Sequence, residues 1–237
     1  MRVEQQPGFV LHARAWRETS LLLEVLSRDH GRVGLVARGV RSARARASRN
    51  LLQPLTPLSL SWSGSGELAT LASAEAVGAP LLLAGESLLC ALYLNELVAR
   101  LLPRNDALPQ VFDAYAEALT RLAQASAPAW TLRRFERDLL GHLGYGVVLD
   151  SEAESGSPLR ADGSYAYRTD AGPVPWHGVA DGLRVRGSAL LALANDRMPD
   201  AEDLQALRRL MRALITHHLD GAPLRAWTLF GSAHGGS

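Results

Sequence analysis

The sequence predicts an α+β protein of two parts, a small antiparallel β-barrel followed by a helical domain. Up to residue 78, short apolar runs with strand-like alternation are separated by turns at Asp29 to Gly31 and at Ser63 to Gly66. After Pro80 the apolar residues recur with helical spacing. We therefore expect a barrel domain of residues 1–79 and a helical domain of residues 80–237.

Five segments carry the strand pattern. Five short antiparallel strands within residues 1–79 suit a closed barrel better than a sandwich. The segments are FVLHARAW, SLLLEVLSRDHG, GRVGLVARGV, LTPLSLSWSGSGEL and ATLASAEAV.

Helical periodicity predicts five helices in the second domain. Gly144 to Gly146 end the third of them. Residues 150–182 are polar and rich in Gly and Pro, which predicts a looped or ribbon-like insert. The expected helices are residues 81–102, 107–125, 131–143, 187–194 and 201–219.

The basic residues exclude several chemistries. All 25 are arginine, and without lysine there is no P-loop lysine and no Schiff-base lysine. The single cysteine, Cys90, lies in an apolar run, so we expect neither a disulfide framework nor a cysteine zinc site. Each arginine is a permanently charged planar fork that matches phosphate.

Charge is distributed unevenly along the chain. Residues 1–50 hold ten arginines and four acidic residues, a net charge of +6, whereas the remainder has a net charge of −5. Residues 38–50, RGVRSARARASRN, contain five arginines and no acid. This asymmetry predicts a polyanion-binding face on the barrel, and a solvated loop is the alternative.

Three stretches together resemble the bacterial RecO family. They are RETSLLLEVLSRDHGRVGLVARGVR, LLQPLTPLSLSW and LRRFERDLLGHLGYGVVLD, in this order. The resemblance implies an N-terminal OB-fold and a recombinational DNA repair mediator without enzymatic activity. Such a protein binds single- and double-stranded DNA and anneals complementary strands without ATP. It also binds the acidic tail of single-strand binding protein (SSB) and works with RecR to load RecA.

The expected DNA-binding residues follow from the loops of an OB barrel, which flank its binding face. Trp16 is the stacking candidate among them, whereas Phe9 is expected in the core. Because these contacts are to phosphates, we expect no base-specific readout. The full set is Arg14, Trp16, Arg17, Arg28, Arg32, Arg38, Arg41, Arg44, Arg46 and Arg49.

The resemblance also implies a site for the SSB tail, on the helix predicted at 131–143. Arginines there could pair with a carboxylate beside an apolar pocket. The carried-over residues are Arg133, Arg134, Phe135 and Leu139, and a plain amphipathic core helix is the alternative.

One departure from the family concerns zinc. Many relatives carry four cysteine ligands in the insert, whereas Asp150 to Pro158 contain none here. We therefore expect no metal and no cofactor, and an insert held by the packing of Tyr165, Tyr167 and Trp176.

Two other functions remain open at this point. An arginine-rich barrel could bind RNA or serve transcription. A nuclease would need a carboxylate cluster for Mg²⁺ near the basic face, where only Glu24 and Asp29 occur. No apolar stretch suits a membrane span and no signal peptide is recognised, so we expect a cytoplasmic, nucleoid-associated protein.

Overall fold

The computed structural model describes residues 2–41, 46–64, 66–124, 126–178 and 182–228. The chain forms two compact units, Met1–Ser126 with Leu224–Ser237, and Ala127–Pro223. The sequence-based boundary at residues 79–80 marks the change from strands to helices, whereas the compact units divide after Ser126. Among the described helices, none is both long and apolar enough to span a membrane.

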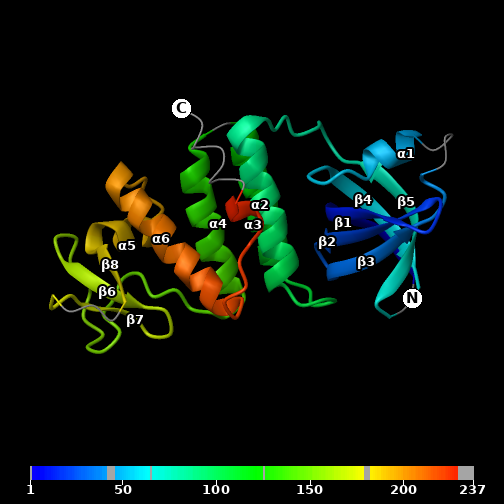
Figure 1. Cartoon of the computed structure of the whole chain (residues 1–237). Helices are drawn as coiled ribbons and strands as arrows, with labels where there is room; N and C mark the ends of the chain where they lie inside the picture. Colours follow the sequence, from blue (N-terminus) through cyan, green and yellow to red (C-terminus); the bar gives the residue numbers. More distant parts are fainter. Residues whose placement is uncertain (1, 42–45, 65, 125, 179–181, 229–237) are drawn as a thin grey trace. The chain divides into compact units, whose positions relative to one another are not determined.

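Five strands of the first unit form a closed barrel in the order β1-β2-β3-β5-β4 (Figure 1). All neighbours are antiparallel except β3 and β5, and β4 closes the barrel against β1. This confirms the predicted fold class. The strands are β1 (Arg2–Trp16), β2 (Ser20–Ser27), β3 (Gly31–Ala37), β4 (Pro57–Ser63) and β5 (Leu68–Ala76).

A short helix, α1 (Arg46–Leu51), lies in the chain between β3 and β4. The sequence analysis predicted no helix there, because five arginines in thirteen residues obscure any apolar periodicity. The strand order and the position of α1 are those of an OB-fold.

Alternating apolar residues fill the barrel interior. On β2, Leu21, Leu23 and Val25 are buried in one cluster with Val10 of β1 and Leu35 of β3. Because side chains alternate across a strand, this register directs every second residue inward. The register therefore fixes which residues of β2 and β3 remain on the outside of the barrel.

The outer face of β1 is covered by two helices, α2 (Gly85–Leu101) and α3 (Pro109–Ala123). Phe9, predicted to be in the core, is 5% exposed, and its ring lies 5.4 Å from Phe112 and 5.1 Å from Tyr115. β1 is consequently buried on both faces where it meets these helices. This packing explains why α2 and α3 belong to the same compact unit as the barrel.

A buried polar link joins the barrel to both helices. The register of β1 against β2 shifts between Val10 and His12, so Leu11 has no partner residue on β2. Asn95 of α2 donates its Nδ2 hydrogen to the Leu11 carbonyl oxygen at 3.0 Å. The Tyr115 hydroxyl in turn donates to Asn95 Oδ1. The bulge carbonyl is thus satisfied by a side chain rather than by a strand.

The loop after α2 packs closely on the β2–β3 turn. Gly31 has a φ of +63°, and a Cβ added there would lie 1.9 Å from the Asp106 carbonyl oxygen. Asn105 donates its backbone N–H to the Arg32 carbonyl oxygen at 3.0 Å. Glycine at position 31 is therefore required both by the turn and by the approach of residue 106.

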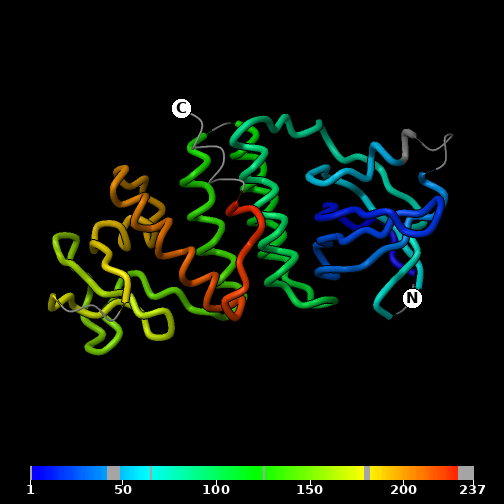
Figure 2. Tube along the Cα trace, in the orientation of Figure 1, coloured from blue at the N-terminus to red at the C-terminus, as the bar shows by residue number. Residues whose placement is uncertain are grey.

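The C-terminal segment of this unit is held on α2. The backbone N–H groups of Arg225 and Ala226 donate to the two carboxylate oxygens of Glu96, each at 2.8 Å. Leu224 is buried beside them. Figure 2 shows this segment, in red, running next to the helix.

The second unit packs three helices with a small sheet. The helices are α4 (Pro128–His142), α5 (Gly187–Ala194) and α6 (Ala201–His218). All three were predicted within three residues of their observed ends. Asp200 accepts the Asp203 backbone N–H at 2.8 Å and caps α6.

The insert, predicted to be looped or ribbon-like, contains a small antiparallel sheet. Its order is β7-β6-β8, with β6 at Ser164–Arg168, β7 at Gly172–Pro175 and β8 at Leu183–Arg186. The strands have four or five residues, too few for a clear alternation in the sequence. Tyr165 and Tyr167 are buried as expected, and Trp176, half-buried, lies 5.5 Å from the Arg184 guanidinium.

We expect Gly31→Ala to lower the free energy of unfolding by about 2 kcal/mol or more, because it combines backbone strain with a clash against Asp106. Urea unfolding measures the change. Gly78→Ala is the matched control: its φ is +73° but nothing lies within 4 Å of the added carbon, so only about 1 kcal/mol is expected. Equal losses in the two variants would contradict the close packing of the 103–107 loop.

Candidate nucleic-acid interface

The arginines predicted to bind DNA fall into two groups in the structure. Arg28 and Arg32 pair with carboxylates of the same unit, whereas Arg14, Arg17, Arg38, Arg41 and Arg49 are exposed. Arg44 lies outside the described residues, as does the side chain of Arg46 in α1. Only the exposed group can meet a polyanion without first losing a carboxylate partner.

Arg28, directly after β2, is held by α3. Its Nε and Nη2 atoms each donate to an oxygen of Asp113 at 3.0 Å, a parallel two-bond geometry. These hydrogen bonds hold the pKa of the Asp113 carboxyl below its usual range. Asp113 therefore occupies the hydrogen-bonding edge of the guanidinium that a phosphate would otherwise contact.

Arg32 has a structural position on β3. It donates to the Ala99 carbonyl oxygen at 2.8 Å and lies 3.3 Å from Glu24 of β2. Arg104 reaches the other oxygen of Glu24 at 2.5 Å. Partial burial lowers the pKa of the Arg32 guanidinium, with Glu24 opposing that shift and Arg104 adding to it. This network fixes the loop after α2 on the barrel.

Arg14, Arg17, Arg38 and Arg41 gather where β1 and β3 end and β2 begins, whereas Arg49 is on α1. Arg14 is on β1 opposite Leu22, Arg17 is in the β1–β2 turn with a φ of +53°, and Arg38 follows β3. Arg41 donates from Nη1 to the carbonyl oxygens of Arg17 and Glu18, at 3.1 and 3.2 Å. Arg41 thus ties the turn to the segment that leaves β3, and it positions Arg17 beside Arg38.

A hollow of about 750 Å³ opens between these segments. Trp16, half-buried at the end of β1, is part of its wall. The lining residues are Trp16, Arg17, Glu18, Thr19, Ser20, Val36, Arg38, Gly39 and Leu68. The sequence analysis named three of them. It missed the others because Val36 and Leu68 come from separate strands that only the barrel brings together.

The residues predicted for the SSB tail are mostly interior. Phe135 is 2% exposed and Leu139 is fully buried, so a peptide could contact neither without moving α4. Arg133 is also buried and lies 2.5 Å from Glu136. These three side chains therefore lie in the interior in this structure, and their part in binding the tail stays a prediction.

Arg134 is the one member of that set with an accessible side chain. It pairs with Asp196, which follows α5, at 3.2 and 2.7 Å, and Arg137 reaches the same carboxylate at 2.7 Å. Partial burial raises the pKa of the Asp196 carboxyl, but the hydrogen bonds from Arg137 and Arg134 outweigh it and hold that pKa below its usual range. Because Arg137 also pairs with Asp138, the cluster holds two guanidinium groups and two carboxylates, and Arg134 has Asp196 as its carboxylate partner.

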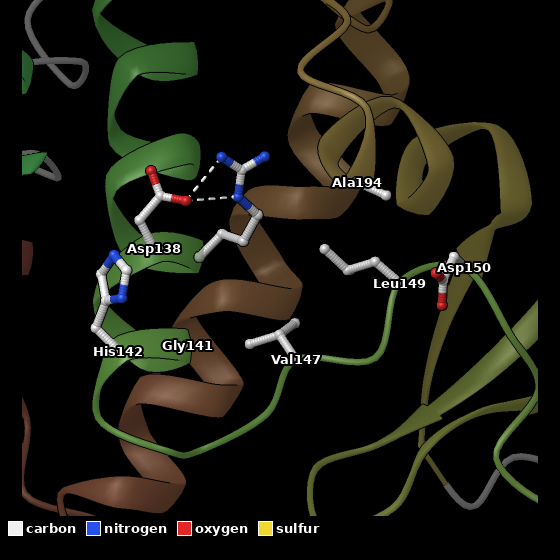
Figure 3. A pocket seen from close by; sticks show the side chains of 8 residues that line it. Asp138, Gly141, His142, Val147, Leu149, Asp150 and Ala194 are labelled. Atoms are coloured by element: carbon white, nitrogen blue, oxygen red, sulfur yellow. Dashed lines mark hydrogen bonds and ion pairs between the residues drawn. The ribbon is translucent and has the colours of Figure 1, made fainter. Parts of the chain in front are cut away.

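A second hollow, of about 360 Å³, lies beside the C-terminal half of α4. Figure 3 shows Asp138 and His142 projecting from α4, with Val147 and Leu149 facing them from the following segment. Arg137 lines it but is bonded to Asp138. Its lining also includes Asp150, so its charge is mixed rather than basic.

Comparisons with known proteins identify the family. The family model described as "Recombination protein O N terminal" matches residues 1–80, and "Recombination protein O C terminal" matches residues 83–228. This chain belongs to the RecO family. The DNA repair protein RecO of Nitrosococcus oceani is 48% identical over 227 residues, covering 95% of this chain and 92% of that protein. That of Stenotrophomonas maltophilia strain K279a is 49% identical over 232 residues, 97% of each chain.

A third RecO relative is similarly close. The DNA repair protein RecO of Xanthomonas campestris pv. campestris strain B100 is 47% identical over 235 residues, covering 97% of this chain and 96% of that protein. Because the match extends over both units, RecO membership indicates a role in DNA repair for the whole chain.

A RecO-type zinc site does not fit the residues of this insert. Four thiolates are needed, whereas the chain has one cysteine, Cys90, buried in α2. In the part of the chain that the structure describes, no three His, Cys, Asp or Glu side chains are grouped as metal ligands. Hydrogen bonds occupy the region instead: Leu159 donates its backbone N–H to the Asp150 carbonyl oxygen, and Arg160 donates its backbone N–H to Tyr165 Oη, each at 2.8 Å.

Proposed function

We propose that this protein is a recombinational repair mediator that binds single- and double-stranded DNA through its barrel and anneals complementary strands without ATP. We further propose that it acts with SSB and RecR to promote RecA loading, in the cytoplasm at the nucleoid, and that it is not an enzyme. The observation that carries the DNA-binding proposal is the group of exposed arginines at one end of β1, β2 and β3.

Phosphate attraction explains why such a surface suits annealing. Arginines that contact phosphates release counterions, and this contribution does not depend on base sequence. Two complementary strands repel each other until that charge is screened, so a shared cationic surface favours their encounter. The exposed set proposed for this role is Arg14, Arg17, Arg38 and Arg49, with Arg41 holding the turn in place.

The partner proposal concerns α4. The tail of SSB is acidic and ends in phenylalanine in the family, and a carboxylate is bound well by a planar guanidinium. Arg134 and Arg137 offer such groups around Asp196, which an incoming carboxylate would replace. The contacts with RecR and RecA rest on the family resemblance.

Replacing Arg14, Arg17, Arg38 and Arg49 by alanine should abolish acceleration of annealing and reduce the magnitude of the log–log salt slope of DNA binding by about 3. Annealing is followed with two complementary oligonucleotides, one of them fluorescent, without ATP, and binding by anisotropy at several salt concentrations. The charge-matched control replaces four exposed arginines elsewhere, Arg100, Arg197, Arg208 and Arg209.

The control should retain both activities. Equal losses in the two quadruple variants would mean that net charge, rather than this surface, governs binding. Competition between DNA and RNA of the same sequence distinguishes the RNA-binding alternative. Mg²⁺-dependent cleavage of the labelled strand would favour a nuclease instead.

Asp113→Asn should strengthen DNA binding, because it frees the guanidinium of Arg28 from its carboxylate partner. One added phosphate contact steepens the log–log salt slope by about 0.7 to 0.9. Anisotropy titrations measure it. Glu117→Gln removes a charge from the same helix without touching Arg28, since Glu117 pairs with Arg121. If both variants bind equally, the gain comes from charge alone.

Arg134→Ala should weaken binding of a peptide with the sequence of the SSB tail about tenfold, the usual loss of a charge-assisted contact, and leave DNA binding unchanged. Fluorescence anisotropy of the labelled peptide measures this. Arg209→Ala on α6 is the control. Phe135→Ala is unsuitable, because removing a buried ring costs about 3 to 5 kcal/mol of stability. Unchanged peptide binding would remove Arg134 from the site.

A further inference from the structure

The hollow at the end of the barrel has the volume of a ligand site. Its volume of about 750 Å³ falls within the roughly 300–1,000 Å³ typical of small-molecule pockets. Three chain segments form it: the β1–β2 turn, the end of β3 with the residues after it, and the first residue of β5. Nothing in the proposed phosphate binding requires a concave site of this kind.

The walls of the hollow are fixed relative to one another. Arg41 donates its backbone N–H to the Thr19 carbonyl oxygen at 2.8 Å, in addition to the two bonds from its guanidinium to Arg17 and Glu18. On the opposite side, β3 and β5 are joined in register, with Gly34 opposite Leu68 and Val36 opposite Thr70. A site held in this way loses little conformational entropy when it is filled.

The lining separates into an apolar part and a charged part. Trp16 and Val36 are half-buried, and Leu68 is 41% exposed although it is a large apolar residue. Arg17 and Arg38 are exposed at the same hollow, together with the hydroxyl-bearing Thr19. The occupant must therefore have an apolar face and a polar edge, with negative charge beside it.

A nucleobase on its sugar-phosphate backbone has this combination of properties. Its flat face stacks on aromatic rings, its edge carries hydrogen-bonding groups, and a phosphate precedes and follows it. Arg17 and Arg38 attract phosphate and Glu18 repels it, so the phosphate contacts are assigned to the two arginines and the base edge to the polar residues of the turn.

We propose that this hollow takes one unstacked base of a single DNA strand, with Trp16 as the stacking platform and Arg17 and Arg38 as the phosphate contacts. The inference rests on the proposed DNA-binding function and adds a preference to it. In a duplex the bases are stacked and paired, so a duplex offers phosphates but no free base. The barrel should consequently bind single strands with an additional contact that duplex DNA cannot make.

The test compares an intact single-stranded oligonucleotide with one of the same length in which every base is replaced by an abasic site. The phosphate charge is the same in both, so phosphate binding alone predicts equal affinity. We expect the wild type to bind the intact strand more tightly. Trp16→Ala should lower affinity for the intact strand about fivefold or more, and Trp16→Phe should lower it less because a ring remains. Neither change should affect the abasic strand or duplex DNA.

Tryptophan fluorescence gives a second reading that does not require the alanine variant to fold. The intact strand should quench the wild type more than it quenches Trp16→Phe, and the abasic strand should quench neither. Equal affinity of the wild type for intact and abasic strands would overturn the base site and leave DNA binding standing. Failure to bind either strand would overturn the proposed function together with the site.

Discussion

The buried hydrogen bond from Asn95 to the Leu11 carbonyl oxygen is the constraint around which the first unit is organised. A bulge in β1 leaves that carbonyl without a strand partner, and an unsatisfied buried carbonyl costs about 1–3 kcal/mol. Asn95 satisfies it from α2, and Tyr115 of α3 bonds the other end of the same amide. Burial raises the pKa of the Tyr115 hydroxyl, which therefore stays a donor. One polar chain thus links the barrel to both helices.

The packing of α2 and α3 on β1 also decides which arginines of the barrel pair with carboxylates. Because α2 and α3 cover one side of β1, the acidic residues of these helices can pair with nearby arginines of the barrel. Asp113 of α3 pairs in this way with Arg28. The network of Arg32, Glu24 and Arg104 fixes the loop after α2 in the same way. The arginines of the β1–β2 turn and of the end of β3 remain exposed. The packing of helices on the barrel therefore divides one basic segment into structural and accessible arginines.

The second unit has an ion pair buried in its helical core. Arg133 and Glu136 are both buried on α4 and form a pair one turn apart. A buried pair of this kind contributes little net stability but is costly to break, because the remaining charge has no solvent. It also keeps the arginine of an apparently amphipathic helix away from the surface. The insert that follows is held by short strands and buried tyrosines.

The sequence by itself indicated the family, and it determined the fold class, the five barrel strands and five of the six described helices. Those features depend on local periodicity and on turn residues, which neighbouring residues in the chain encode directly. It also located the basic pole in the first fifth of the chain. It indicated a looped or ribbon-like insert but did not locate the three strands, because strands of four or five residues are too short for an alternation to stand out.

Only the tertiary structure decided which arginines are accessible. Arg17 and Arg28 look alike in the sequence, but Asp113 lies 85 residues beyond Arg28 and meets it only after α3 has packed on β1. In the sequence, Phe135 and Leu139 likewise fit either a peptide-binding groove or a helix core. In the folded chain both side chains are buried. The hollow beside Trp16 depends on the pairing of β3 with β5, a parallel contact between distant segments that no local pattern records.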